Sequence, residues 1–386
     1  MTTTINNEHK KLNVPNIRFP EFQEEWEKQK LCDISSIVGR IGFRGYTTND
    51  IVEKGMGAIA LSPTNIVNNQ LTYDKDNTYI SMSKYEESPE IMIKRGDVIF
   101  VKTGSTVGKV AYVDKMICKT TLNPQVVVLK DIKCDNYILS VIMSTRNFQN
   151  KIQRITVGGA VPTLSQVAMG NIFISLPAAK EQEKISKFIS LLDERIATQN
   201  KIIDKLQTLI KGIAQNIACN NRPNIRISEC LECSSSTLQE SDVCEHGTYP
   251  VYGANGIVGY LDNYNTEGEA IYIIKDGSGV GTVSYATGKC SATGTLNTLQ
   301  AKEGYSLQYL YYLLKVFNFE PYKTGMAIPH IYFKDYGKAK IFCPSYTEQL
   351  QYARLLSAID SKLLAEHIFL TNLSLQKQYL LRQMFI

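Results

Sequence analysis

The glycine-rich segment 103–110 comes closest in residue type to a nucleotide-binding loop. A phosphate loop of that kind needs a glycine five residues before its second glycine, and a serine or threonine after its lysine. Here Thr103 stands five residues before Gly108, and Val110 follows Lys109. The segment therefore fails the pattern twice. Two interpretations stay open: a loop that holds a DNA phosphate on its backbone N–H groups, and a tight hairpin that needs glycine for its dihedral angles.

Other patterns resemble chemical sites but lack the required spacing. Residues 277–281 read Gly-x-Gly-x-Gly before a strand, whereas a dinucleotide fold needs Gly-x-Gly-x-x-Gly before a helix. The methyltransferase motif with two prolines and an aromatic residue is reduced to Asn-Pro-Gln at 123–125. His330 lies in a repeated loop, with Thr163 at the matching position, and no histidine suggests a catalytic triad. The sequence predicts no catalytic site in this chain.

A zinc site is the one metal centre that the sequence suggests. Cys230, Cys233, Cys244 and His246 are four residues of the right type. A single residue separates Cys244 from His246, which is unusually short, and the first half of the chain has no counterpart. Buried or idle thiols are the simpler interpretation. We expect no metal and no cofactor in this chain.

The composition describes a folded protein of several domains. The chain has 386 residues, of which 44% are apolar and 20% charged, so two or three domains are expected and disorder is not. No apolar run reaches the ~20 residues of a membrane span. The N-terminus lacks a signal-peptide core, and nine scattered cysteines indicate reduced thiols. We expect a cytoplasmic protein that does not associate with membranes.

An internal repeat organises the chain. The segment that begins at Gly158 returns 167 residues later at Gly325. Such a duplication implies two similar bodies, most simply related by a pseudo-twofold axis. The identical pairs at this offset are Gly158/Gly325, Ala160/Ala327, Pro162/Pro329, Gly170/Gly337, Ile174/Ile341, Pro177/Pro344, Glu181/Glu348, Gln182/Gln349, Ser190/Ser357 and Asp193/Asp360.

Each copy of the repeat ends in a long helix, expected at 178–220 and at 345–386. Apolar positions there recur in alternating steps of four and three residues, which is the heptad seam of a coiled coil. Gln199 and Glu366 are polar positions near the middle of the two seams. Because the two seams match, each helix is expected to pack on the other, and twofold symmetry between the repeats requires the pair to run antiparallel. Each helix would be about 50 Å long. The alternative is that each helix packs on its own globular domain.

A globular region precedes each helix, at 17–177 and at 221–344, after a flexible N-terminal tail at 1–16. Strand-like runs and glycine turns fill both regions, and short helices are expected at 136–150 and 307–317. The predicted fold class is therefore α+β. It consists of two β-rich domains joined by two long antiparallel helices that form a coiled-coil spacer, with pseudo-twofold symmetry.

This arrangement resembles the specificity subunit of type I restriction–modification systems, over essentially the whole chain. The start of the chain at 15–22, followed by Trp26, is similar to that family's N-terminal signature. The repeated Gly-x-x-x-Pro segment that leads to Pro-x-x-x-Glu-Gln is typical of both halves of the family. The Tyr-Gly-Ala-Asn-Gly-x-x-Gly-Tyr stretch at 252–260 is common in its recognition domains.

The resemblance implies a non-catalytic subunit whose two target recognition domains each read one half of a bipartite, non-palindromic DNA site. The helix pair would set the spacing of the half-sites, on the order of one to one and a half DNA turns. It would also dock two methyltransferase subunits. Those partners would bind S-adenosylmethionine, and two restriction/translocase subunits would use ATP and Mg²⁺.

The candidate DNA contacts come from loops and from an uneven charge distribution. Residues 91–155 contain 11 Lys and Arg against 4 Asp and Glu, which is typical either of a polyanion-binding face or of a solvated surface. Arginine suits guanine and asparagine suits adenine, whereas lysine and serine mainly bind phosphate. The candidates are Arg40, Arg44, Tyr46, Lys102, Ser105, Lys109 and Lys119 in the first domain, and Tyr252, Asn255, Lys275, Ser278 and Lys289 in the second.

Two other functions stay open: a tandem-domain scaffold that binds protein without recognising DNA, and an enzyme that uses a nucleotide. Salt-dependent DNA binding would argue against the scaffold. ATP turnover by the isolated chain would favour the enzyme.

Overall fold

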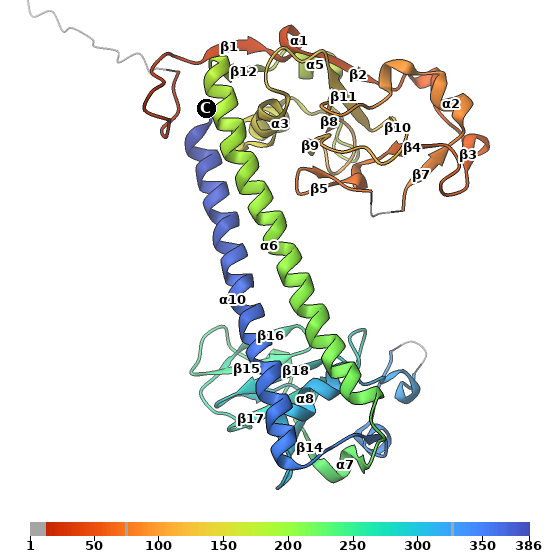
Figure 1. Cartoon of the computed structure of the whole chain (residues 1–386), viewed down its shortest axis with the longest axis vertical. Helices are drawn as coiled ribbons and strands as arrows, with labels where there is room; N and C mark the ends of the chain where they lie inside the picture. Colours follow the sequence, from red (N-terminus) through yellow and green to blue (C-terminus); the bar gives the residue numbers. More distant parts are fainter. Residues whose placement is uncertain (1–12, 74–75, 326–327) are drawn as a thin grey trace, which may run out of the picture. The chain divides into compact units, whose positions relative to one another are not determined.

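The computed structural model describes residues 13–73, 76–325 and 328–386. The chain divides into two compact units, one formed by the described residues up to Ile196 together with Asn372–Ile386, and the other by Ala197–Thr371. Each unit is a mixed α+β body, so the predicted fold class is confirmed (Figure 1). No helix in the described part of the chain is long and apolar enough to cross a bilayer.

The first unit is built on two main sheets, ordered β2-β11-β8-β9-β6-β5 and β10-β4-β7-β3, with a small pair β1-β12. Its strands are β1 Glu27–Lys30, β2 Ser36–Gly39, β3 Ile51–Val52, β4 Ala58–Leu61, β5 Ile66–Val67, β6 Gln70–Leu71, β7 Thr78–Ile80, β8 Val98–Val101, β9 Val110–Tyr112, β10 Thr120–Leu122, β11 Val126–Lys130 and β12 Phe173–Leu176. Strands β8 and β11 are apolar runs whose side chains are buried on both faces of the sheet. For this reason apolar and polar residues do not alternate along them.

Alternate side chains of β8 enter two different cores. Val98 and Phe100 belong to the cluster shared with the helices, whereas Ile99 and Val101 belong to a cluster that includes Ile59 of the second sheet. This division follows from the two-residue period of a strand. The larger sheet of the first unit thus lies between a helical layer and the smaller sheet.

The second unit repeats this plan with a four-stranded sheet β14-β20-β17-β18, a three-stranded sheet β16-β15-β19 and a pair β13-β21. Its strands are β13 Ile225–Arg226, β14 Leu231–Ser235, β15 Tyr249–Gly253, β16 Gly256–Leu261, β17 Glu269–Ile274, β18 Val283–Thr287, β19 Ser291–Ala292, β20 Leu296–Ala301 and β21 Lys340–Ile341. In β17, Ile271 and Ile273 face the helix-covered core, whereas Ala270 and Tyr272 face the smaller sheet.

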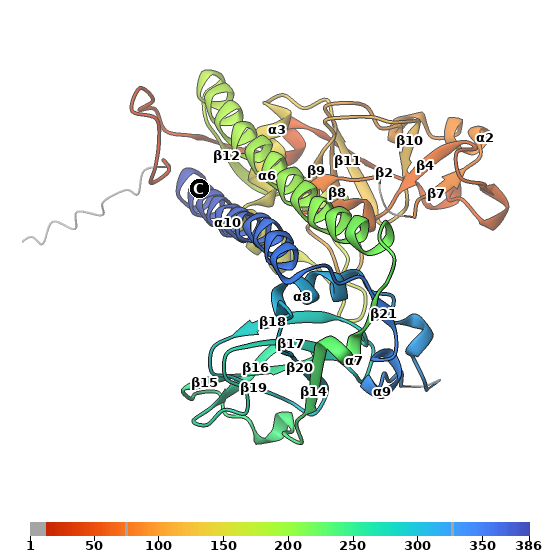
Figure 2. The ribbon, with the colours of Figure 1, turned by 60° about the horizontal axis from the view of Figure 1, so that its bottom comes forward.

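Short helices cover one face of each larger sheet, and Figure 2 shows α8 against β17 and β18. Asp135 caps α3 by accepting the backbone N–H of Ile138, and Ser306 caps α8 by accepting that of Tyr309. The helix predicted at 136–150 is interrupted at Thr145, whose extended backbone ends α3 and whose hydroxyl caps α4. The short helices are α1 Leu31–Ile34, α2 Met82–Glu86, α3 Asn136–Ser144, α4 Arg146–Ile155, α5 Gln166–Gly170, α7 Ile227–Cys230, α8 Leu307–Val316 and α9 Phe333–Tyr336.

The two long helices are α6 Ala179–Cys219 and α10 Tyr346–Met384. Every predicted seam position is buried or half-buried. These positions are Ile185, Ile189, Leu192, Ile196, Gln199, Ile203, Leu206, Ile210, Ile213 and Ile217 in α6, and Tyr352, Leu356, Ile359, Leu363, Glu366, Leu370, Leu373, Lys377, Leu380 and Met384 in α10. In the first unit the beginning of α6, at Ile185, shares a core with the end of α10, at Met384. In the second unit the end of α6, at Ile217, shares a core with the beginning of α10, at Leu356.

The antiparallel pairing of the helices is therefore confirmed. The same two cores contain sheet residues, Val98 in the first unit and Ile271 in the second. Near its globular domain, each helix packs on the domain and on the other helix together. The two packing modes weighed from the sequence are thus not exclusive.

The N-terminal boundary differs from the expected tail at 1–16. Residues 1–12 lie outside the described part of the chain. Asn13 donates its backbone N–H to Glu25 at 3.3 Å, and Asn16 donates its amide to Gln383 at 3.0 Å. Ile17 also donates its backbone N–H to the Gln383 carbonyl at 3.0 Å. Residues 13–16 therefore belong to the folded first unit, because the end of α10 offers them hydrogen-bond partners.

Candidate functional site

The two glycine loops singled out in the sequence have the same hydrogen-bond frame, each within its own unit. Gly104 N donates to Pro162 O at 2.9 Å, and Gly277 N donates to Pro329 O at 3.0 Å. At the other end of each loop, Gly108 N donates to Val101 O at 3.0 Å and Gly281 N to Ile274 O at 2.9 Å. The repeat is thus reproduced at the level of single hydrogen bonds.

This frame bears on the phosphate-loop interpretation. Gly104 and Gly108 have φ values of 103° and 100°, which glycine adopts without strain. Their N–H groups, together with those of Val107 and Lys109, donate to protein carbonyls. These four amides are therefore occupied within the hairpin, which favours the hairpin over a loop that binds phosphate through its backbone.

The loop side chains are the more suitable groups for an external ligand. Ser105 and Lys109 are exposed and Lys102 is half-buried, and the Lys109 ammonium lies 3.3 Å from the Ile66 carbonyl. In the second unit Ser278 is exposed, and the Lys275 ammonium lies 3.8 Å from Asp276. The structure thus places Lys102, Ser105 and Lys109 together on one loop.

Arg40 has a different environment from the one that its sequence context suggests. Arg40 is only 5% exposed, and its guanidinium donates to Leu122 O at 2.8 Å, Thr121 Oγ1 at 3.1 Å and Arg44 O at 3.2 Å. Burial lowers the pKa of Arg40 from its ordinary value. Each of its three guanidinium nitrogens donates to a protein acceptor, so in this conformation Arg40 supports the loop instead of presenting itself to base edges.

The remaining candidates of this loop gather near Arg40. Tyr46 packs its ring 5.5 Å from the Arg40 guanidinium, and burial raises the pKa of Tyr46. Arg44 is partly exposed and lies 3.5 Å from Glu90. Lys119 is exposed, with its ammonium 5.8 Å from the centre of the Tyr85 ring. These residues form a second group around β10. The hydrogen bonds given for this group do not involve the glycine loop, which lies elsewhere in the sequence.

In the second unit the candidates are spread over three places. Tyr252 of β15 packs its ring 5.3 Å from Tyr272. Asn255 is exposed in the turn between β15 and β16. Lys289 stands apart, with its ammonium 4.8 Å from the Tyr264 ring centre and 3.7 Å from Glu267. The structure does not bring Lys289 together with the β17–β18 loop.

A polar pair beside the second glycine loop was missed by sequence reasoning. His330 Nδ1 lies 2.6 Å from Asp276 Oδ1, and backbone bridges join the same two residues. In the first unit the bridged pair is Thr103 and Thr163. The match of His330 with Thr163 was visible in the sequence, but the pairing with Asp276, 54 residues away, was not. One backbone frame therefore carries different side chains in the two units.

The basic stretch 91–155 does not form a row of unengaged cations. Lys130 binds the Met92 carbonyl at 2.5 Å, Lys133 binds the Asp33 carbonyl at 2.8 Å and Lys151 binds the Phe173 carbonyl at 2.8 Å. Part of its charge therefore holds the first unit together.

The cysteines suggested as zinc ligands are free thiols in different environments. Cys230 is buried, Cys233 is half-buried and Cys244 is exposed. In the described ranges no group of three or more His, Cys, Asp or Glu side chains is arranged to hold a metal.

A model of the family described as type I restriction modification DNA specificity domain matches the chain twice, at residues 23–208 and 224–368. The chain is 24% identical over 400 residues to a putative type I restriction enzyme MjaX specificity subunit of Methanocaldococcus jannaschii, which covers 91% of each protein. It is 29% identical over 118 residues to a putative type I restriction enzyme specificity subunit, S.HindORF215P, of Haemophilus influenzae. That alignment spans 30% of this chain and 31% of the relative.

Among solved structures, the chain is similar to a type I restriction–modification S subunit from M. genitalium, with a TM-score of 0.62 and 16% identity. The match covers 97% of this chain and 99% of that one. The chain also matches a structure from work on the structural basis of complex assembly and conformational transition in the type I restriction–modification system. The TM-score is 0.54 and the identity 16%, and the match covers 92% of this chain and 96% of that one. At this level of identity the likeness concerns the fold.

Proposed function

The chain belongs to the family of type I restriction–modification DNA specificity proteins, and from this premise we propose that it is the sequence-reading subunit of such a system. In this proposal each unit reads one half of a bipartite, non-palindromic site in double-stranded DNA. The two long helices set the gap between the half-sites. They also dock two methyltransferase subunits, and two restriction/translocase subunits join the complex.

One observation supports two different half-sites above all others. The frames around Gly104 and Gly277 share their backbone hydrogen bonds, yet the residues joined by the backbone bridge beside them are two threonines in one unit and Asp276 with His330 in the other. A retained scaffold with changed polar groups is what reading two different sequences requires, since base edges are distinguished by donor and acceptor patterns. A structural duplication alone would not need such differences.

The proposal gives this chain no catalytic step. S-adenosylmethionine would be bound by the methyltransferase subunits, and ATP with Mg²⁺ by the restriction/translocase subunits. Ser105 and Lys109 of the first unit and Ser278 and Lys275 of the second would bind phosphates, which fixes the register of each domain on the duplex. Asn255 at its exposed turn and Arg44 are the candidates for base contacts.

The test is the methylome of cells that express this chain with its partner subunits. The proposal expects one motif composed of two short, different half-sites with a fixed unspecified gap. An exchange of the region 221–344 for that of another specificity subunit should change one half-site and leave the other intact. Methylation at palindromic or ungapped motifs would contradict the proposal, as would salt-independent DNA binding by the assembled complex.

A further inference from the structure

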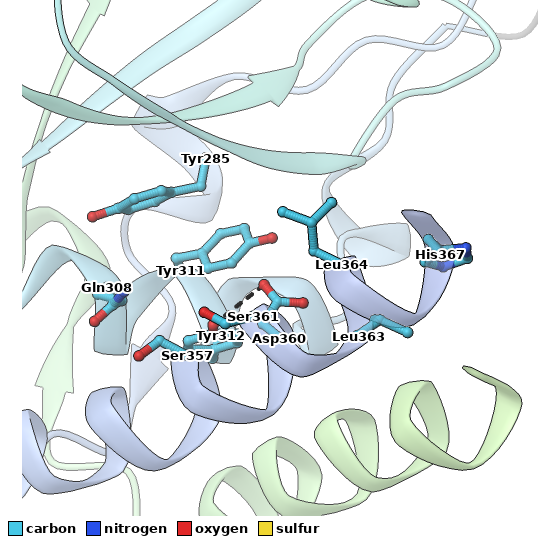
Figure 3. Close-up of a pocket in the computed structure, with 10 residues that line it drawn as sticks. All are labelled: Tyr285, Gln308, Tyr311, Tyr312, Ser357, Asp360, Ser361, Leu363, Leu364 and His367. Atoms are coloured by element: carbon cyan, nitrogen blue, oxygen red, sulfur yellow. Dashed lines mark hydrogen bonds between the residues drawn. The ribbon is translucent and has the colours of Figure 1, made fainter. Parts of the chain in front are cut away.

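A pocket of about 430 Å³ lies within the second unit, between α8, β18 and α10. Tyr285, Tyr311 and Tyr312 supply aromatic walls, and Asp360 supplies a carboxylate. Figure 3 shows the Asp360 carboxylate directed toward the Tyr311 ring, with Leu364 beside it. Tyr312 donates its hydroxyl hydrogen to Asp360 Oδ2 at 3.3 Å. The pocket therefore combines aromatic rings with an acidic group.

The first unit contains the repeat-equivalent carboxylate with a bound cation. Asp193 corresponds to Asp360 at the 167-residue offset. Its Oδ2 accepts a hydrogen bond of 2.6 Å from the Tyr137 hydroxyl, and its Oδ1 forms a salt bridge with the ammonium of Lys377 from α10. In the first unit an ammonium group from the facing helix thus neutralises this carboxylate.

The second unit does not supply that ammonium itself. The position equivalent to Lys377 is Ile210, which is 5% exposed and belongs to the apolar core. In the described part of the chain, Asp360 has a hydrogen bond from Tyr312 and no salt bridge. Lys315 places its ammonium 5.1 Å from the Tyr311 ring centre, but it is not among the residues that line the pocket. The carboxylate is therefore left for a cation from outside the chain.

The surroundings favour a protein as the source of this cation. On α10, Leu364 lines the pocket and is 63% exposed, and Ile368, four residues further on, is 56% exposed. Exposed apolar residues beside a pocket are typical of a protein contact. At the equivalent positions α6 carries Ala197 and the cation Lys201. The apolar flank is thus specific to α10, as is the open carboxylate.

We propose that this pocket is a socket for a lysine or arginine side chain of the subunit that docks on α10. The proposal rests on the proposed function, in which that subunit is a methyltransferase. The cation would pair with Asp360 and lie against the Tyr311 ring, an arrangement that combines a salt bridge with a cation–π contact. Because Asp193 is already neutralised by Lys377, the two docking sites of the chain would differ in charge.

The test uses the full chain assembled with the methyltransferase subunit of the same system, followed by native mass spectrometry across a range of salt concentrations. Asp360→Asn should weaken binding of one of the two methyltransferase copies by about tenfold or more, since the cation of the partner subunit loses its carboxylate. Tyr311→Leu should weaken the same step less, since it removes only the cation–π contact. Asp360→Asn should also reduce the salt dependence of that step. The matched control Asp193→Asn should lower thermal stability and leave assembly unchanged.

A photoreactive group placed on Ser361→Cys gives a second measurement that does not depend on a weakened variant. It should cross-link to a methyltransferase segment that contains a lysine or arginine. Unchanged affinity and salt dependence of Asp360→Asn would overturn the socket and leave the proposed function intact, as would cross-links to segments without a basic residue. Failure of the unaltered chain to bind any methyltransferase subunit would overturn the docking part of the proposed function and the socket with it.

Discussion

The Tyr137 hydroxyl donates a hydrogen bond of 2.6 Å to Asp193, and this contact joins the short helix α3 to the long helix α6. Burial and the neighbouring Asp193 carboxylate raise the pKa of Tyr137, so the phenol stays a donor throughout the physiological pH range. In the second unit Tyr312 of α8 makes the corresponding contact with Asp360 at the longer distance of 3.3 Å. In each unit a tyrosine–aspartate hydrogen bond thus joins a short helix of the globular domain to a long helix.

These bonds are expected to differ in strength. Tyr137→Phe should lower the free energy of unfolding by about 1.5–3 kcal/mol, because the hydrogen bond lost is one to a charged acceptor. Tyr312→Phe should cost less, since its bond is longer and Asp360 is partly open to the pocket. Urea unfolding followed by circular dichroism measures both variants. An equal or larger effect of Tyr312→Phe would contradict this ranking.

Arg18 and Glu181 form a bidentate salt bridge, with both N–O distances at 2.7 Å. The Glu181 side chain is 0% exposed and that of Arg18 is 12% exposed. Arg18→Ala would leave a buried carboxylate without its partner, which typically costs about 3–5 kcal/mol. We expect a loss of this size in the first unit, measured by hydrogen exchange at the start of α6.

The control for Arg18 is the repeat-equivalent carboxylate, Glu348. Glu348 is exposed and accepts hydrogen bonds from Ser345 N at 3.1 Å and Ser345 Oγ at 2.6 Å, as the third residue of α10 in a capping box with Ser345. Glu348→Gln should cost about 1 kcal/mol or less, in the range of a helix cap. If Arg18→Ala costs no more than Glu348→Gln, the buried pair does not stabilise the first unit as we expect.

Glu181 and Glu348 also show how far the sequence repeat predicts structure. The neighbouring pair Gln182 and Gln349 makes the same contacts in both units: each side-chain amide donates to the proline five residues earlier and accepts an N–H at the start of α3 or α8. Glu181 and Glu348 are also identical in sequence. Glu181 is nevertheless buried against Arg18, whereas Glu348 is exposed and pairs with Ser345 at the start of α10. Arg18 lies 163 residues from Glu181 in sequence, so the repeat alone does not distinguish the two glutamates.

Local patterns predicted the elements well, whereas side-chain environments required the fold. The heptad steps identified the buried face of α6 from Ile185 to Ile217, because the period of a helix is fixed by backbone geometry. Arg40 was predicted to reach DNA, but its acceptors at Thr121 and Leu122 lie about 80 residues away in sequence. The pocket at Asp360 combines three separate segments and has no signature in any of them.

The pair of Gln199 and Glu366 gives a prediction about pH. Gln199 is 5% exposed and donates its side-chain amide to Glu366, which also accepts from Lys362. Hydrogen bonds from Lys362 and then Gln199 lower the pKa of Glu366. Because the folded pKa lies below the unfolded value, this contribution to stability is present above the unfolded pKa. It is lost as the pH falls through the folded pKa.

Glu366→Gln should therefore flatten the fall of the melting temperature on acidification below about pH 4.3, the ordinary pKa of a glutamate. Glu183→Gln serves as the control, because Glu183 is exposed on α6 and has no salt-bridge partner in the described residues. Differential scanning calorimetry between neutral pH and the acid range compares the two variants. Parallel curves for Glu366→Gln and the unaltered chain would show that this carboxylate does not contribute.

Arg40 and Arg44 allow structural and sequence-reading roles to be separated within one loop. Arg40→Ala removes a buried guanidinium and leaves the Leu122 carbonyl and the Thr121 hydroxyl without their donor. Buried acceptors left unpaired cost about 1–3 kcal/mol each. We therefore expect Arg40→Ala to lower the melting temperature of the first unit. DNA binding should weaken evenly across target sequences.

Arg44→Ala should have the opposite profile, because Arg44 is partly exposed and its contacts with the Glu87 carbonyl and with Glu90 are long, at 3.3 and 3.5 Å. Stability should change by less than about 1 kcal/mol, as for surface pairs, while the preference at one half-site relaxes. Methylation rates on a library of half-site variants, with thermal unfolding of the same preparations, measure both effects. If Arg44→Ala methylates the same sites at the same relative rates as the unaltered chain, Arg44 does not read bases. If Arg40→Ala weakens binding to some target sequences more than to others, Arg40 has that role instead.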